Sequence, residues 1–446
     1  MRPEPPALRP AVVIAIAVAA ALAALASRSP GLRFVDVVAF AARAEQLGER
    51  LADPLYPVGY PALLAAAHAL GADVLAAAKA ISVAAGALAA FAAAALVGPG
   101  PAAWLAAGGG ALEWGATEGT DLPAAALALA GIAAGWRRAP ALAGALVGGA
   151  CLVRYTSLAA VPVVLLLEPR AWRTLLLAVA PHFVLAAWSG VSPLPDQSVN
   201  LAIGANGRAG PLWSTDTLVR LPHGFGRALR DALPDWPTRV AALGLLVGAR
   251  DLRARALLGW ALLHCGLVAL AFANQRLCLP AQLAFSLGAA WLVPARFRLA
   301  LAALAVALGV HNARPLWTPE ARFVELAALA ERAGHLDGPF LSNSAWFHVR
   351  RDGWLRGATL LQGLGDPRRL TPASLAALLH RHGADAVALE MVRVPGALPG
   401  LVPLMKTVPP ELVLVAETPT WRVFAAAPAA AAAPEPPRGG APSAGE

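Results

Sequence analysis

The chain has 446 residues, of which 58% are hydrophobic and 14% charged, a composition that excludes an ordinary soluble protein. Its apolar segments consist largely of Ala, Leu, Val and Gly, which favour helices, and they lack the ten-residue alternation of an outer-membrane barrel. The formal net charge is +9, but the arginines are spread among short loops and form no single basic face, which argues against a nucleic-acid partner. The sequence therefore predicts a polytopic α-helical membrane protein.

The first apolar run, residues 11–27, follows Arg2 and Arg9 and is expected to cross the membrane from the cytoplasm outward. A cleaved signal peptide is the alternative interpretation. If the first helix is uncleaved, the chain has about eleven spans in all, and every Arg-dense short loop falls on the cytoplasmic side, as the positive-inside rule requires. The expected spans are residues 11–27, 72–97, 102–116, 122–135, 140–153, 156–167, 174–190, 238–249, 256–273, 277–293 and 299–310.

The first outer loop, residues 28–71, contains an isolated acid, Asp36. A carboxylate at the edge of a bilayer is costly and usually serves chemistry, ion coupling or a buried pair. An amphipathic helix is expected directly after it, over residues 37–51, and a second interfacial helix over residues 60–70. The alternative role for Asp36 is that of a plain helix N-cap.

Further polar residues are expected at the same face of the membrane. Glu118 and Asp121 lie in the second outer turn, and Arg154 and Arg276 lie at the outer ends of spans. The alternative interpretation is a solvated turn with Asp121 as a helix cap, together with two interfacial arginine anchors. Cysteines and histidines suggest no metal site, because Cys151, Cys265 and Cys278 lie in or beside apolar segments without ligand spacing.

After residue 315 the composition changes to a soluble pattern, and residues 315–425 are predicted to form a small α/β domain on the outer face. Its expected helices are residues 319–333 and 372–382, and its expected strands are residues 339–342, 386–391, 412–416 and 420–425. The tail, residues 426–446, is rich in Ala, Pro, Gly and Ser and is predicted to be disordered.

Features in a fixed order along the membrane part carry a family resemblance. They are Asp36 after the first span, the run Pro54 to Leu64, the acidic second outer turn, the segment Gly149 to Tyr155 and the segment Asn274 to Pro280. Over about residues 10–310 this set resembles the GT-C superfamily of integral-membrane glycosyltransferases, especially its protein mannosyltransferase and aminoarabinose transferase branch. The chain departs from that pattern at Val37, where relatives often carry a second acid, and at Phe40, where they carry Tyr.

The resemblance implies that Asp36 takes a proton from an acceptor hydroxyl as that oxygen attacks the anomeric carbon of a polyprenyl-phosphate sugar. Arg276 and Arg154 would then stabilise the leaving phosphate, because planar guanidinium groups match phosphate oxygens. The other expected substrate-binding residues are Tyr56, Tyr60, Glu118 and Asp121. Glu118 and Asp121 could instead hold a divalent cation, and the metal dependence stays open because members of the superfamily differ.

The sequence thus predicts a glycosyltransferase of the bacterial cytoplasmic membrane, with its site on the outer face and a glycan, lipid or protein acceptor. The main alternative is a secondary transporter or lipid flippase, in which Asp36, Glu118, Arg154 and Arg276 would line a path through the bilayer. Transporters often contain two matching halves, and no such internal repeat is visible in the sequence. A third interpretation is a non-catalytic scaffold whose outer domain binds a partner.

Overall fold

The computed structural model describes residues 8–29, 31–47, 57–188, 190, 215–270, 275–318, 320–334, 336, 338–364 and 366–427. The chain forms two compact units. The first is Met1–Phe323 with Asp352–Leu355, and the second is Val324–Arg351 with Arg356–Glu446. Most of the tail for which disorder is predicted lies outside the described residues.

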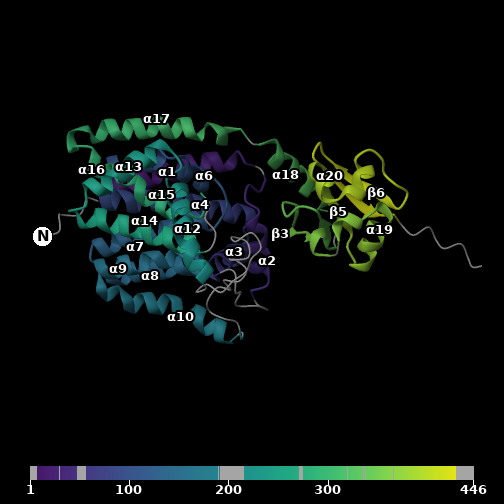
Figure 1. Ribbon diagram of the computed structural model, residues 1–446, viewed down its shortest axis with the longest axis horizontal. Coiled ribbons are helices and arrows are strands. Elements are labelled where there is room, and N and C mark those ends of the chain that lie inside the picture. The colour runs from purple at the N-terminus through teal and green to yellow at the C-terminus, as the bar shows by residue number, and fades with distance from the viewer. Residues whose placement is uncertain are drawn as a thin grey trace, which may run out of the picture. The chain divides into compact units, whose positions relative to one another are not determined.

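The first unit is a helix bundle (Figure 1). Its helices are α1 Leu8–Ser27, α2 Asp36–Glu45, α3 Gly59–Ala69, α4 Val74–Val97, α5 Pro99–Ala102, α6 Gly109–Ala116, α7 Asp121–Trp136, α8 Pro140–Val153, α9 Ala160–Leu167, α10 Trp172–Trp188, α12 Thr215–Ala232, α13 Trp236–Val247, α14 Leu252–Leu270, α15 Leu279–Ser286, α16 Ala289–Leu292 and α17 Arg298–Trp317. Short 3-10 turns join some of them: η1 Ala103–Ala106, η2 Tyr155–Ala159, η3 Pro169–Ala171 and η4 Ala295–Phe297.

Several helices of the bundle suit a membrane. Within the described residues, those long and apolar enough to span one are Leu8–Ser27, Val74–Val97, Pro169–Trp188, Leu252–Leu270 and Ala295–Trp317. Shorter apolar helices are Asp121–Trp136, Pro140–Val153, Tyr155–Leu167, Trp236–Val247 and Leu279–Leu292. The predicted helical membrane class is confirmed, whereas the total of about eleven spans stays a prediction.

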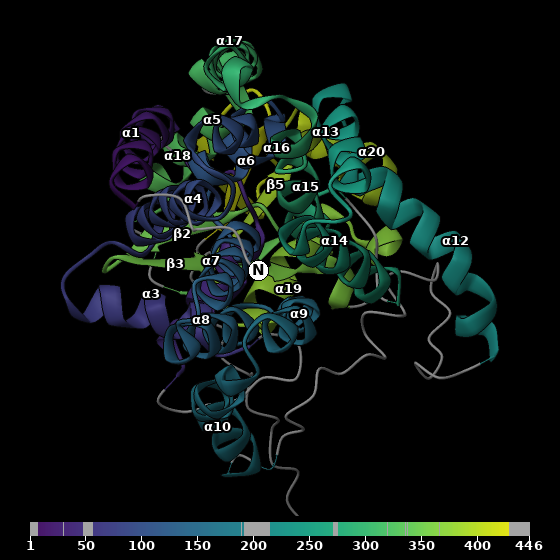
Figure 2. The ribbon, with the colours of Figure 1, turned by 90° about the vertical axis from the view of Figure 1, so that its left-hand side faces the viewer.

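Helices α1, α4, α7, α8 and α10 pack against one another in that order, and Figure 2 shows them as one continuous layer. Their contact faces consist mainly of Ala and Gly, which let helix backbones approach closely inside a bilayer. At Gly131 of α7, for example, an added Cβ would lie only 2.4 Å from a methyl group of Val147. Small residues therefore determine how tightly this layer packs.

Gly144→Ala on α8 is expected to lower the free energy of unfolding by about 1–3 kcal/mol, because overpacked interfaces must shift to make room. The new methyl group would meet the backbone oxygen of Ala171 at 2.2 Å. Thermal unfolding in detergent measures the effect. Gly149→Ala on the same helix is the matched control, since its nearest neighbour is a Leu127 methyl group at 3.9 Å. Equal melting temperatures for the two variants would contradict the prediction.

Two segments predicted as single spans are interrupted. Within residues 102–116, η1 and α6 are separated near Gly108, where an added Cβ would lie 3.1 Å from Thr238 Oγ1. Within residues 277–293, α15 and α16 are separated near Gly288, where an added Cβ would lie 2.1 Å from the backbone oxygen of Ala241. Each break falls at a glycine that a neighbouring residue approaches too closely for a larger side chain. Glycine also has a low helix propensity, so the helix ends there.

A helix, α12, stands where the sequence predicts part of a long polar loop over residues 191–237. Its apolar residues recur at helical spacing and include Leu221, Phe225 and Ala228. It packs against α14, and at Gly224 an added Cβ would lie 2.8 Å from the backbone oxygen of Ala269. Burial of one apolar face against α14 therefore offsets the weak helix propensity of its Gly and Pro residues.

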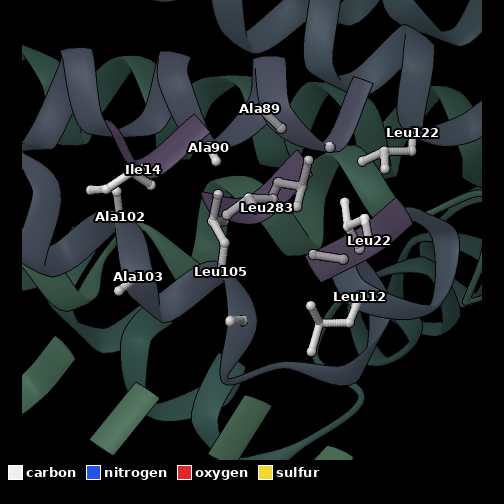
Figure 3. A pocket seen from close by; sticks show the side chains of 14 residues that line it. Ile14, Leu22, Ala89, Ala90, Ala102, Ala103, Leu105, Leu112, Leu122 and Leu283 are labelled. Atoms are coloured by element: carbon white, nitrogen blue, oxygen red, sulfur yellow. The ribbon is translucent and has the colours of Figure 1, made fainter. Parts of the chain in front are cut away.

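A small cavity lies among α1, α4, η1 and α6 (Figure 3). Its volume is about 70 Å³, and the side chains that line it are all apolar, including Leu22, Leu105 and Leu283. A sugar or a phosphate would find no polar side chain in it. We interpret it as a void left by the many alanines of these helices.

The second unit contains a five-stranded mixed sheet with the strand order β4-β1-β5-β7-β6. The strands are β1 Phe340–Ser342, β4 Thr359–Leu360, β5 Ala386–Glu390, β6 Leu412–Glu417 and β7 Trp421–Ala426. Strand β1 pairs in parallel with β4 and β5, while β7 pairs antiparallel with β5 and β6. Helix α19, Pro372–Arg381, adds Leu375 and Leu379 to a core that also contains Val387, Leu389 and Phe424.

The chain also forms a hairpin that the sequence analysis does not predict, of β2 His348–Arg351 and β3 Trp354–Gly357. Its turn is Asp352–Gly353, and both residues have positive φ, 51° and 77°. Asp-Gly is the preferred pair for a two-residue turn that requires positive φ at both positions. This signal was present in the sequence, but the Arg-rich strands beside it obscured the alternation of a hairpin. Helices α18 Ala321–Ala333 and α20 Val394–Ala397 are the remaining α-helices described after α17.

Candidate active site

Asp36 is the first residue of α2, directly after the segment that leaves α1. The N-cap position belongs to Val35, and no side-chain capping bond forms there. The alternative interpretation of Asp36 as a plain helix cap is therefore wrong. Its carboxylate is 34% exposed and accepts a hydrogen bond from Arg276 Nη2 at 3.2 Å.

Arg276 links this carboxylate to a second one. Its Nε lies 3.4 Å from Asp121 Oδ2, and its guanidinium lies over the ring of Phe34, 4.1 Å from the centroid. The turn that carries Arg276 is held by Gln282, whose side-chain amide donates to the backbone oxygen of Gln275 at 2.7 Å. Arg276 is thereby fixed between two acids that lie far apart in the sequence.

Asp121 begins α7 and its side chain is only 3% exposed. Its Oδ1 lies 3.0 Å from Arg154 Nη1, which also donates to Thr120 Oγ1 at 2.7 Å. The contact between Asp121 and Arg154 forms because α7 and α8 pack against each other. Asp121 is the first residue of α7, and Arg154 directly follows the last residue of α8. Thr120, not Asp121, occupies the N-cap position, so the expected capping role of Asp121 is also wrong.

These contacts form an alternating ion-pair chain: Asp36, Arg276, Asp121 and Arg154. The sequence predicts all four as site residues, and the structure brings them together at one end of the bundle. Tyr56 lies outside the described residues. Among the described residues, no group of three or more His, Cys, Asp or Glu side chains is arranged to hold a metal ion.

Glu118, in the same turn as Thr120, is fully buried. Its Oε1 accepts hydrogen bonds from the backbone N–H groups of Arg33 and Phe34, the latter at 2.7 Å. Burial raises the pKa of Glu118, while backbone N–H groups and the charge of Lys79 act in the opposite direction. Glu118 therefore fastens the segment that leads into α2 and presents Phe34 to Arg276.

Glu118→Gln is expected to gain stability relative to the native chain as the pH is raised from about 5 to about 8. A raised pKa in the folded state means that ionised Glu118 opposes folding, and this cost grows as pH rises from the unfolded value of about 4.3 through the folded one. The Gln side chain keeps an oxygen for both backbone donors and does not ionise. Melting curves across that pH range measure the difference.

Glu118→Ala is the comparison variant, because it leaves the N–H groups of Arg33 and Phe34 without their acceptor. It is expected to lose about 1–3 kcal/mol of stability. Parallel pH profiles for the native chain and Glu118→Gln would show that the buried carboxyl does not influence folding through its charge.

Tyr60 of α3 is fully buried, with its ring edge-to-face against Phe40 at 5.2 Å between centroids. Burial raises the pKa of Tyr60, and the charges of Glu118 and Asp121 add to that shift. Tyr60 therefore stands within electrostatic reach of the buried acids. Its role toward a substrate stays a prediction.

Sequence reasoning missed three residues that shape the site: Phe34 under Arg276, Thr120 beside Arg154, and Gln282 behind the Arg276 turn. Phe34 and Thr120 lie within two residues of predicted site residues, so their proximity was a usable signal. Gln282 gave none, because it is one polar residue inside an apolar helix.

The bundle, the ion-pair chain at one end of it and the mixed sheet define a polytopic helical membrane protein with a small α/β unit. Among solved structures, the chain is similar to ArnT from Cupriavidus metallidurans bound to undecaprenyl phosphate, with 14% sequence identity and a TM-score of 0.56. The match covers 93% of this chain and 97% of that one. The apo crystal structure of the same protein matches with the same identity and coverage and a TM-score of 0.55.

No protein-family profile and no curated protein matches the chain. At 14% identity the likeness to ArnT is one of fold, and it agrees with the helical membrane fold and small C-terminal α/β part that the sequence predicts.

Proposed function

We propose that this protein is a glycosyltransferase that moves a sugar from a polyprenyl-phosphate donor to an acceptor hydroxyl, at the outer face of a bacterial cytoplasmic membrane. The observation that carries the proposal is the partly exposed Asp36 carboxylate, which ends an ion-pair chain whose other acid, Asp121, is buried. The ArnT fold supports it, because that protein was solved with undecaprenyl phosphate bound.

In the proposed reaction, the Asp36 carboxylate takes the proton of the acceptor hydroxyl as its oxygen attacks the anomeric carbon. The bond between that carbon and the phosphate oxygen of the donor breaks, and the polyprenyl phosphate leaves with the electron pair. The products are the glycosylated acceptor, the carrier phosphate and protonated Asp36, which then returns its proton to water.

The pairing of Asp36 with Arg276 suits this reaction for a second reason. While Asp36 is ionised, the Arg276 charge is balanced by that carboxylate and by Asp121. Once Asp36 has accepted a proton, the guanidinium is freed to face the negative charge that grows on the departing phosphate. Base and cation therefore act in sequence within one ion pair.

The function is tested in vesicles that contain the purified protein and a panel of polyprenyl-phosphate sugars. We expect one donor to be consumed, with release of the polyprenyl phosphate and labelling of an acceptor. Mass spectrometry of envelope glycans from a deletion strain would then identify the sugar and the acceptor. Unchanged glycans in that strain, together with no donor consumption in vesicles, would contradict the proposal.

A further inference from the structure

A second candidate site lies away from the ion-pair chain, beneath α12. An apolar groove of about 780 Å³ runs between α12, α14 and the η2–α9 segment. Residues that line it include Phe225, Leu262, Leu263 and Leu267. A pocket of about 440 Å³ adjoins the groove at Pro222, which lines both, and the rest of its lining is His223, Gly226, Arg227 and Arg230.

Helix α12 lines both the apolar groove and the basic pocket because it is amphipathic. Its basic residues Arg220, His223, Arg227 and Arg230 recur at three- and four-residue spacing and so occupy one face. The apolar residues on the other side pack toward α14. Figure 2 shows α12 along the edge of the bundle. A helix of this kind belongs at the boundary between hydrocarbon and lipid headgroups.

Two glycines keep this region open. Gly266 of α14 lines the groove and Gly226 of α12 lines the basic pocket. Within the part of the chain that the structure describes, a Cβ added to either glycine would meet no atom within 4 Å. Glycine inside a helix costs stability, and here no neighbouring helix requires it. We infer that Gly266 and Gly226 keep the groove and the basic pocket open.

A bound ligand has to suit both the apolar groove and the basic pocket. Leu262 and Leu263 in the groove are 39% and 45% exposed, so the groove opens sideways from the bundle, where the bilayer supplies hydrocarbon chains. Arg227 is exposed and forms no ion pair within the described part of the chain, so its charge is available to an anion. A phosphate on a hydrocarbon chain matches this combination.

We propose that the groove and the basic pocket bind an anionic phospholipid of the bilayer, with an acyl chain along α14 and the phosphate against His223, Arg227 and Arg230. The site is connected to the ion-pair chain. Gln282, which holds the Arg276 turn, also donates to the backbone oxygen of Asp231 at the end of α12, at 3.1 Å. A lipid bound to α12 would thereby stabilise the helix to which Gln282 connects the Arg276 turn.

The test titrates the purified full-length chain with phosphatidylglycerol or phosphatidylcholine of identical acyl chains and counts bound lipid by native mass spectrometry. The native protein is expected to prefer phosphatidylglycerol. The double variant Arg227→Gln/Arg230→Gln should bind phosphatidylglycerol at least about fivefold more weakly, with phosphatidylcholine unchanged. Gly266→Leu, which places a larger apolar side chain in the lining of the groove at a position where the added Cβ has open space, should weaken binding of both lipids alike.

Controls are Arg250→Gln, an exposed arginine elsewhere on the bundle, and Gly363→Leu, a glycine in open space in the second unit. Both should bind as the native protein does, and melting temperatures verify that every variant is folded. Native-like preference in the double variant, or native-like binding by Gly266→Leu, would overturn the proposal.

A third arm uses undecaprenyl phosphate as the probe. If the substitutions remove binding of that lipid but leave phosphatidylglycerol binding intact, the occupant is a polyprenyl carrier and the proposal is wrong. No sugar transfer is measured in any arm, so the lipid site and the proposed reaction can each fail without the other.

Discussion

Asp36→Asn is expected to abolish sugar transfer in reconstituted vesicles, with a loss of at least about 100-fold, the usual contribution of a general base. The Asn side chain has nearly the same shape and can still accept a hydrogen bond from Arg276, but it cannot take the proton of the acceptor hydroxyl. Because the Asp36 carboxylate is 34% exposed, the fold should tolerate the change. Initial rates of donor consumption and a melting curve measure the two effects.

The matched control is Asp366→Asn, which alters a more exposed acid of the second unit that also pairs with an arginine, Arg369. Its transfer rate should equal that of the native protein. Asp121→Asn separates the effect of charge from base chemistry. It removes the buried negative charge that lies between Arg154 and Arg276, so it should lower the melting temperature. Turnover retained by Asp36→Asn at the native rate would rule that residue out as the base.

Arg276→Ala is expected to reduce transfer by about 100-fold or more, and Arg276→Lys by less. Alanine removes the cation and leaves Asp121 and Asp36 without their shared partner. Lysine keeps the charge, but a single ammonium cannot span two carboxylates and stack on Phe34 as the planar guanidinium does. The order of rates should therefore be native, then Lys, then Ala.

Arg250→Ala serves as the control for loss of one exposed positive charge on the bundle. Binding of undecaprenyl phosphate, measured without sugar, distinguishes lost affinity from lost chemistry in the Arg276 variants. Equal transfer rates in the Arg, Lys and Ala forms would mean that Arg276 is only an interfacial anchor.

The membrane class and the approximate helix positions could be predicted because hydropathy and arginine-rich loops report directly on a bilayer. The same topology places Asp36, Arg154 and Arg276 on one side of the membrane, which is why they could be grouped. The pairings themselves could not be predicted. Asp36 and Arg276 are 240 residues apart, and no local pattern encodes which carboxylate a guanidinium contacts.

The misjudged elements share a physical cause. Helix α12 contains Pro222, Gly224 and Gly226, which are typical of loops, and only its packing against α14 makes a helix stable there. The breaks near Gly108 and Gly288 depend on other helices passing close by. Tertiary contacts decided these segments, and a single sequence contains no record of them.

The ion-pair chain contains two positive and two negative side chains, so these four charges cancel. An electrically balanced site exerts little pull on small ions dissolved in the surrounding water. Under the proposed function, inorganic phosphate should therefore compete poorly with a carrier lipid that arrives within the membrane plane, and a phosphate-rich medium should not inhibit transfer.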